Sequence, residues 1–269
     1  MERTPRVKKI TSLDLPELQP YRTLRRSVEH KKTGIFVAEG EKVVRRLFSS
    51  GIEVISALMT PEWFEKTHPA GAEVYIADMK LLESIVGYNL HQGIMAVGKV
   101  PDEIPLDELV PKLPQPHLFV ALDGLVNSEN VGTIVRNCAA FGVQAVIAGE
   151  TSSSPYLRRA VRNSMGAVFR MPVVHAPHLA ESLAGLERRH RTRVVAADPR
   201  GRSVIDDRIL DGNICIVLGN EGDGVSQAVL DVCSERVAIP MMNDTDSLNV
   251  ASASAVFLYE ARKRLRHSR

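Results

Sequence analysis

Strand-like and helix-like runs alternate along residues 117–269, and this alternation restricts the fold more than any other feature of the sequence. Apolar runs of strand length include HLFVALDGL (117–125), VQAVIAG (143–149) and NICIVLGN (213–220). Runs with apolar residues at helical spacing lie between them, and the longest is SLNVASASAVFLYEARKRLR (247–266). Strands separated by helices predict an α/β fold, with a parallel sheet covered on both faces. In such sheets ligands bind beyond the carboxyl ends of the strands.

A proline-rich stretch at residues 101–116 (PDEIPLDELVPKLPQP) divides the chain. It holds five prolines and four acidic residues, and proline removes backbone donors and favours extended conformations before it. We therefore predict a linker with at most a short helical turn, between domains at residues 1–100 and 117–269. The first domain also alternates strand-like and helical runs, such as 34–40 (GIFVAEG) and 41–51 (EKVVRRLFSSG), which predicts a small α/β sandwich.

Composition excludes several classes of protein. The chain has 34 Lys and Arg against 32 Asp and Glu, and 44% of its residues are hydrophobic, as in ordinary globular proteins. No run approaches the roughly 20 apolar residues of a membrane span, and the N-terminus lacks the apolar segment of a secretory signal. Cys138, Cys215 and Cys233 are too widely spaced for a disulfide or zinc framework. We expect a cytoplasmic protein with no metal ion and no membrane partner.

Basic residues are concentrated in three segments. Residues 1–50 hold twelve Lys or Arg and six acidic residues, residues 157–170 hold four Arg and no acidic residue, and residues 259–269 hold five Lys or Arg and one acidic residue. Such segments on a nearly neutral chain attract the phosphates of a polyanion. Solvated helix faces and a frayed terminus explain the same charges, so the pattern leaves both interpretations open.

Polar residues also gather where predicted strands end. Residues 127–130 (NSEN) follow the first strand of the second domain, and Asn130 is placed to cap the next helix and leave backbone N–H groups facing outward. Six residues later, Arg136 lies in an otherwise apolar helix. Its position alone is equally consistent with a functional role and with a guanidinium that extends into solvent.

Two further polar segments follow later strands. Residues 219–224 (GNEGDG) hold three glycines, which permit close backbone approach to a ligand, and an acidic residue suited to a hydroxyl or cation. A tight turn between strand and helix explains these glycines as well. Residues 241–249 (MMNDTDSLN) join a strand to a helix of small residues, and Ser247 and Asn249 are candidate caps of that helix. The P-loop, the dinucleotide fingerprint and the nucleophile elbow are absent from the sequence.

In combination and order, these segments resemble motifs one, two and three of the SpoU (TrmH-type) RNA ribose methyltransferases of the SPOUT superfamily. The matching residues are N-x-G-x-x-x-R at 130–136, L-G-N-E-G-x-G at 218–224, I-P-M followed by S-L-N-V within 239–250, and an R-x-S-x-G-A element at 162–167. In the N-terminal part, residues 36–51 and HQGIMAV (91–97) are similar to the substrate-binding domain that precedes the catalytic domain in many members.

The resemblance implies a fold, a cofactor and an assembly. The C-terminal domain would contain a deep trefoil knot, bind S-adenosylmethionine in that knot, and form a homodimer that completes the active site. The N-terminal domain would be a small α/β RNA-binding domain. The implied cofactor-binding residues are Leu218, Gly219, Asn220, Gly222, Ile239, Met241, Ser247 and Leu248.

The resemblance also implies the reaction, which is methyl transfer to a ribose 2′-hydroxyl. A free hydroxyl is a poor nucleophile, so its proton must leave during attack. Arg136 would be the catalytic base or would position the phosphate and the hydroxyl, and both roles stay open because a guanidinium normally keeps its proton. The residues implied to orient the ribose and Arg136 are Asn130, Glu221, Ser247 and Asn249. The activated methyl group needs no metal ion.

RNA is the implied partner. The implied RNA-binding residues of the N-terminal domain are Arg25, Arg26, Lys31, Lys32, Arg45 and Arg46. The appended N-terminal domain favours ribosomal RNA over transfer RNA, because that arrangement is frequent among members that act on ribosomal RNA. The alternatives are a 2′-O-methyltransferase of transfer RNA and a non-catalytic RNA-binding protein with the same fold. Methylation of a base nitrogen is disfavoured, since the knotted enzymes that perform it carry different motifs.

Overall fold

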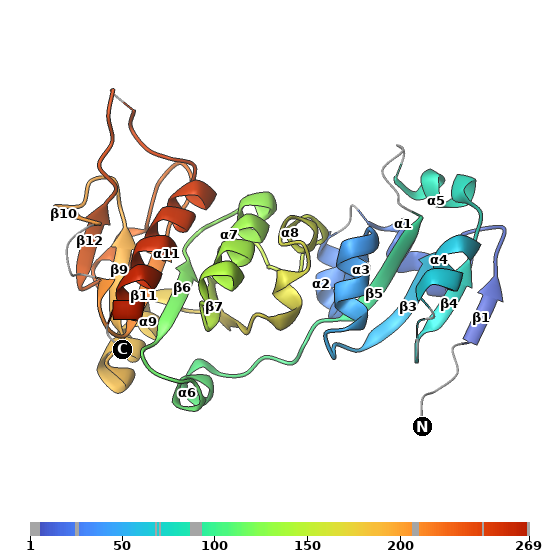
Figure 1. Cartoon of the computed structure of the whole chain (residues 1–269), viewed down its shortest axis with the longest axis horizontal. Coiled ribbons are helices and arrows are strands. Elements are labelled where there is room, and N and C mark those ends of the chain that lie inside the picture. Colours follow the sequence, from blue (N-terminus) through green and yellow to red (C-terminus); the bar gives the residue numbers. More distant parts are fainter. Residues whose placement is uncertain are drawn as a thin grey trace. The chain divides into compact units, whose positions relative to one another are not determined.

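The chain divides into two compact units, each with its own sheet (Figure 1). Unit one comprises residues 1–102 and 156–170, and unit two comprises residues 103–155 and 171–269. The computed structural model describes residues 6–24, 27–67, 69, 71–86, 93–205, 210–243 and 245–267.

Unit one is built on a mixed five-stranded sheet of order β1-β4-β3-β5-β2. Its strands are β1 (Arg6–Lys9), β2 (Ile35–Glu39), β3 (Val54–Met59), β4 (Glu73–Ile76) and β5 (Ile94–Lys99). Its first helices are η1 (Pro16–Leu18), α1 (Gln19–Arg22), α2 (Ser27–Thr33), α3 (Glu41–Phe48), α4 (Pro61–Thr67) and α5 (Met79–Val86). Strands β1, β4 and β3 run parallel, whereas β5 runs antiparallel to β3 and β2. The α/β composition predicted for the N-terminal part is confirmed.

Unit one also includes a segment from the far side of the linker. This segment, residues 156–170, contains α8 (Arg158–Asn163) and η3 (Ala167–Arg170). The Phe36 ring on β2 lies 5.5 Å from the Tyr156 ring and 5.4 Å from the Phe169 ring, measured between centroids. Arg158 Nε donates to Glu39 Oε2 over 2.8 Å, and both side chains are largely buried. Aromatic packing and an ion pair therefore hold the segment in this unit.

Unit two is built on an all-parallel seven-stranded sheet of order β10-β12-β9-β11-β6-β7-β8. Its strands are β6 (Leu118–Leu122), β7 (Ala145–Gly149), β8 (Val173–Ala176), β9 (Arg193–Ala197), β10 (Ser203–Val204), β11 (Ile214–Leu218) and β12 (Glu235–Ala238). Its helices are α6 (Leu106–Leu109), η2 (Val110–Lys112), α7 (Ser128–Phe141), α9 (Leu179–His190), α10 (Gln227–Leu230) and α11 (Val250–His267). The parallel sheet predicted from the alternation is confirmed. The short turn predicted in the linker corresponds to α6 and η2.

Helices cover both faces of this sheet. Alternate residues of the central strands, such as Phe119, Ile147 and Val217, pack with residues of α6, α9 and α10 in one buried cluster. Helices α7 and α11 pack side by side, as Figure 1 shows. Asn137 Nδ2 of α7 donates to the Ala251 carbonyl over 3.0 Å and to Ser254 Oγ over 2.9 Å, both on α11. These contacts join the C-terminal half of α7 to the first two turns of α11.

The trefoil knot implied by the resemblance stays a prediction. Within the described part of the chain, no helix is both long enough and apolar enough to cross a bilayer.

Candidate active site at the carboxyl edge of the parallel sheet

The first motif places an asparagine pair at the start of α7. Asn127 is the N-cap, since its Oδ1 accepts hydrogen bonds from the backbone N–H groups of Glu129 (2.9 Å) and Asn130 (3.4 Å). The prediction that Asn130 caps this helix is therefore wrong. Because Asn127 accepts hydrogen bonds from the free backbone N–H groups at the helix start, the Asn130 side chain is available for other contacts.

Asn130 is the centre of a network that joins all three motifs. Its Nδ2 donates to Glu221 Oε1 over 2.8 Å, and its Oδ1 accepts from Asn249 Nδ2 over 3.3 Å. These residues follow β6, β11 and β12, so strand ends far apart in sequence supply one cluster. We call Asn130, Glu221 and Asn249 the polar trio.

Asn249 also starts α11. Its Oδ1 accepts from the Ala251 N–H over 2.9 Å, so of the two candidate caps Asn249 is the one that caps this helix. Ser247 lies two residues earlier, outside α11, which begins at Val250. Its side chain is exposed. The Asn249 side chain therefore both caps α11 and donates a hydrogen bond to Asn130 within the polar trio.

The second motif forms a closed turn stapled by Asn220. Its N–H and carbonyl pair with Gly224 over 2.9 and 3.0 Å, and its Nδ2 donates to the Gly124 carbonyl over 2.7 Å. Its Oδ1 accepts from the N–H groups of Gly222 (2.8 Å) and Asp223 (3.2 Å). These two amides are therefore bonded within the loop, and Asn220 acts as a structural staple of the turn that presents Glu221.

Gly219 is the position where this turn leaves no room for a side chain. A Cβ there would lie 2.3 Å from Gly224 C, 2.3 Å from Val225 N and 2.5 Å from Gly224 O, all backbone atoms. Beside it, Asp123 links the ends of β6 and β11, since its N–H donates to the Leu218 carbonyl and its Oδ2 accepts from the Ser226 N–H. The glycine is required by close backbone approach within the loop.

Comparison with known proteins places this geometry in a family. Residues 117–259, more than half of the chain, match the SpoU rRNA Methylase family. The chain belongs to the SpoU family. The family predicted from the three motifs is therefore confirmed.

Relatives with similar architecture cover nearly the whole chain. A protein of Mycobacterium tuberculosis (strain ATCC 25618 / H37Rv), named an uncharacterized tRNA/rRNA methyltransferase, is 31% identical over 268 residues, which cover 94% of this chain and 91% of the relative. The SpoU methyltransferase AviRb from Streptomyces viridochromogenes, in complex with AdoMet, has a TM-score of 0.82 at 25% identity, covering 95% of this chain and 100% of AviRb. An AdoMet-bound rRNA methyltransferase from Sinorhizobium meliloti has a TM-score of 0.81 at 28% identity, covering 96% and 98%. This SpoU protein is therefore an RNA methyltransferase.

Arg136 of this SpoU protein is exposed on α7. Six residues separate it from Asn130, which corresponds to about 9 Å along the helix axis. The hydrogen bonds that join the polar trio do not include the guanidinium of Arg136. The structure thus brings Asn130, Glu221 and Asn249 together and leaves Arg136 facing solvent on the same helix.

The implied cofactor-binding residues lie at neighbouring strand ends of the sheet. Leu218 and Gly219 are buried, Asn220, Ile239 and Met241 are half-buried, and Gly222, Ser247 and Leu248 are exposed. They occupy the end of β11 and the loops that follow β11 and β12. This is the edge at which parallel sheets bind ligands.

Asp198 is a candidate that the sequence patterns did not indicate. It follows β9, between the ends of β11 and β12, and is 5% exposed. Its Oδ1 accepts from the Arg200 N–H over 2.9 Å, whereas its Oδ2 is buried and has no hydrogen-bond partner among the described residues. A buried acceptor at this edge fits a ligand with hydroxyl or ammonium donors, as S-adenosylmethionine has. The signal that could have indicated it is an acidic residue directly after the apolar run VVAA (194–197).

Three of the six implied RNA-binding cations have described side chains. Arg25 and Arg26 lie outside the described residues, as does the side chain of Lys31. Lys32 on α2 and both Arg45 and Arg46 on α3 are exposed. Arg45 Nε donates to Glu41 Oε1 over 3.1 Å. Arg46 Nη1 donates to the Met165 carbonyl over 2.5 Å.

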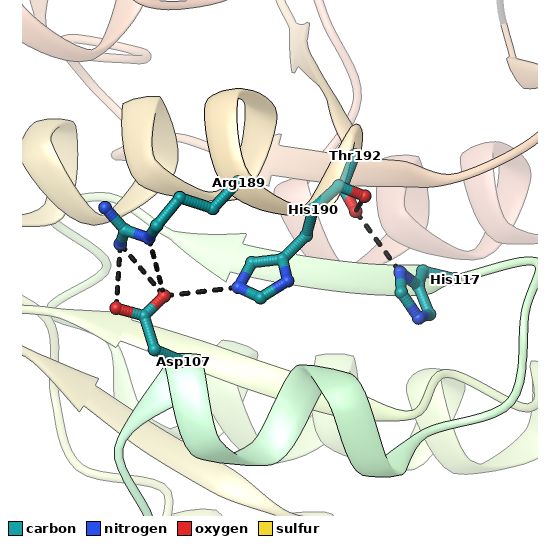
Figure 2. Close-up of polar contacts among 5 residues, drawn as sticks. All are labelled: Asp107, His117, Arg189, His190 and Thr192. Atoms are coloured by element: carbon teal, nitrogen blue, oxygen red, sulfur yellow. Dashed lines mark hydrogen bonds and ion pairs between the residues drawn. The ribbon is translucent and has the colours of Figure 1, made fainter.

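A separate polar cluster lies at the opposite, amino edge of the sheet (Figure 2). Asp107 of α6 points toward the end of α9, where its Oδ2 pairs with Arg189 over 2.8 Å and its Oδ1 with His190 over 3.2 Å. Burial acts to raise the pKa of Asp107, but hydrogen bonds from Arg189 and His190 outweigh it and hold that pKa low. Basic residues suit the carboxyl end of a helix. This cluster therefore fastens the linker helix to α9.

His117 lies near that cluster. Its ring is buried, its Nδ1 lies 3.3 Å from Thr192 Oγ1, and burial lowers its pKa. A cavity of about 250 Å³ adjoins these groups and is lined by Val110, Pro111, Leu113, Gln115, His117, Arg189, His190 and Arg191. The cavity lies away from the polar trio, because His117 precedes β6 and the trio follows the strands.

Proposed function

We propose that this SpoU protein is an S-adenosylmethionine-dependent methyltransferase that modifies a ribose 2′-hydroxyl in RNA. The observation that carries the proposal is the polar trio, in which one residue from each motif meets at the carboxyl edge of the parallel sheet. The AdoMet complexes of AviRb and of the Sinorhizobium meliloti enzyme support the cofactor. A solved structure named an RNA 2′-O ribose methyltransferase, with a TM-score of 0.79 at 27% identity, supports the acceptor.

Each group of residues has a proposed task. The bound cofactor supplies a methyl group activated by its sulfonium. Residues of the β11 and β12 loops hold the cofactor, with Gly219 allowing the tight turn and Asp198 offering a free carboxylate oxygen. The polar trio orients the ribose through its amide and carboxylate groups. Arg136 either takes the proton that leaves the 2′-hydroxyl or positions that hydroxyl and its neighbouring phosphate, and its exposure leaves it accessible to RNA. Ser247, two residues before Asn249 in the sequence, would be a further ribose contact.

Ribosomal RNA is the proposed substrate, with transfer RNA as the second candidate. Unit one carries exposed cations on α2 and α3, which suit a phosphate backbone. The relatives are named for both RNA classes, whereas the Sinorhizobium meliloti enzyme is named for ribosomal RNA alone. We further propose a homodimer, which would bring a second copy to the exposed Arg136, and a cytoplasmic location.

Methyl-label transfer tests the proposal. Purified chain is incubated with methyl-tritiated S-adenosylmethionine and with ribosomal or transfer RNA that lacks its native modification. We expect label in one pool, at one ribose that resists alkaline cleavage. Arg136→Ala should abolish transfer and leave cofactor affinity nearly unchanged, whereas Arg188→Ala, an exposed arginine of α9, should leave both intact.

Two results would contradict the proposal. Label on a base, with no protected ribose, would contradict the assigned acceptor. The absence of both labelling and cofactor binding would favour the non-catalytic RNA-binding protein. Near-normal turnover by Arg136→Ala would remove that residue from the mechanism.

A further inference from the structure

Trp63 is the single tryptophan of the chain and lies on α4 of unit one. The indole is half-buried, so part of its surface faces solvent. None of the residues of α4 is buried. A core-filling role for the ring would require deep burial, so the usual explanation for a large aromatic residue does not apply here.

The Trp63 ring packs against Gly93 and the side chains around it. Gly93 has a left-handed φ of +71°, and a Cβ at that position would lie 3.2 Å from Trp63 Cδ1, 3.0 Å from Thr60 Cγ2 and 3.1 Å from Met79 Cε. Trp63 therefore packs closely against Gly93, where an added methyl group would be in tight contact with three side chains. A seated aromatic ring loses little conformational freedom when a ligand stacks on it.

Two cations lie over the face of the indole. Lys66 Nζ lies 5.0 Å from the ring centroid and Arg45 Cζ of α3 lies 5.7 Å from it. Each cation also pairs with a carboxylate one helical turn away, Lys66 with Glu62 and Arg45 with Glu41. All four charged side chains are at least 38% exposed. Exposed ion pairs and exposed cation–π contacts each contribute little, so both cations can leave the ring and their carboxylates for a phosphate at small cost.

A half-buried aromatic ring with cations over it has a specific chemical preference. Unpaired nucleobases stack on aromatic side chains, and the phosphates on either side of the base bind lysine and arginine. A paired duplex keeps its bases stacked internally and offers no free base face. The arrangement therefore suits single-stranded RNA.

We propose that Trp63 is a stacking platform for an unpaired base of the RNA substrate, with Lys66 and Arg45 binding the neighbouring phosphates. This inference rests on the proposed function, since it assigns a contact to the RNA that the enzyme methylates. It adds a base contact to the phosphate contacts of α2 and α3, and it requires that the bound stretch of RNA be unpaired, as in a loop or a bulge.

Intrinsic fluorescence tests the contact directly, because all tryptophan emission of the full chain comes from Trp63. The chain is titrated with a ten-nucleotide oligo(A), and separately with a blunt RNA duplex of twenty base pairs. We expect saturable quenching by oligo(A) that weakens with added salt, and little quenching by the duplex. Absence of quenching by oligo(A), or equal quenching by both RNAs, would overturn the inference.

Variants provide the second test, through the fluorescence anisotropy of dye-labelled oligo(A). Trp63→Leu should weaken binding about tenfold, whereas Trp63→Phe keeps an aromatic face and should stay within about threefold of the wild type. Phe64→Leu, an aromatic change on the same helix, is the matched control and should bind normally. Far-UV circular dichroism confirms that each variant is folded. Equal binding by Trp63→Leu and Phe64→Leu would overturn the inference.

Methyl-label transfer separates this inference from the proposed function. If the wild-type chain transfers methyl groups to RNA but oligo(A) leaves Trp63 emission unchanged, the platform is absent and the catalytic proposal stands. If Trp63 is quenched by oligo(A) but no RNA accepts label, the platform stands and the catalytic proposal fails.

Discussion

Substitution of Gly219 by alanine tests whether the rigid turn of the second motif is required. The added Cβ would lie 2.3 Å from two backbone atoms of Gly224 and Val225. Ordinary carbon contacts begin near 3.5 Å, so one side of the turn must move by about 1 Å. Gly222→Ala is the matched control in the same loop, because its Cβ would meet nothing closer than 3.5 Å, at Asn220 Oδ1.

The magnitude follows from what the movement breaks. The two backbone hydrogen bonds between Asn220 and Gly224 measure 2.9 and 3.0 Å and cannot persist after such a shift. Their loss and the overpacking together should cost about 3 kcal/mol in the free energy of unfolding. For a unit of this size, that corresponds to a fall in melting temperature of roughly 6–12 °C. Gly222→Ala should change stability by less than about 0.5 kcal/mol.

Thermal unfolding by circular dichroism and cofactor binding by calorimetry measure the two consequences. We expect Gly219→Ala to melt earlier and to lose most of its affinity for S-adenosylmethionine, and Gly222→Ala to keep its melting temperature. If both variants melt within 1 °C of each other and bind the cofactor equally, the close approach at Gly219 is not a constraint and the reasoning is refuted.

Two further predictions concern buried charge. Glu39→Ala should destabilise unit one by about 3 kcal/mol in urea unfolding, because it leaves the largely buried Arg158 without its carboxylate. The control Glu62→Ala removes one partner of an exposed ion pair and should cost under about 1 kcal/mol. Burial lowers the pKa of His117, so the unfolded chain binds its proton more readily and stability should fall as pH drops below about 6.5. His117→Gln should flatten that loss, and the exposed His175→Gln should not.

The sheet and the meeting of the motifs were accessible from the sequence because both depend on local patterns. Apolar runs of strand length, separated by helical runs, specify parallel strands, and parallel strands place their carboxyl ends at one edge. Residues that follow those ends are neighbours in space whatever their separation in sequence. Asn130 and Glu221 are 91 positions apart and still form a hydrogen bond.

Other features depend on tertiary contacts or on differences of one helical turn. Strand β1 is the exposed, charged run RVKK, which has no apolar alternation and is a strand only because it pairs with β4. The cap of α7 is Asn127 instead of Asn130, and both are asparagines within one turn. The place of residues 156–170 in unit one depends on packing against Phe36 and Glu39, which no local pattern reveals.

Asn130→Asp tests whether the polar trio is used in the reaction. It turns a 2.8 Å amide–carboxylate contact with Glu221 into two facing carboxylates, and like charges so close favour protonation of one of them. We expect methyl transfer to fall on the order of 100-fold at neutral pH, from misplacement of the ribose, and to recover partly in mild acid. Gln227→Glu at the start of α10 creates a similar pair of carboxylates with Asp231, the residue after that helix, and should change neither rate nor pH profile. A wild-type pH profile for Asn130→Asp would mean that the contact shapes the resting site but takes no part in transfer.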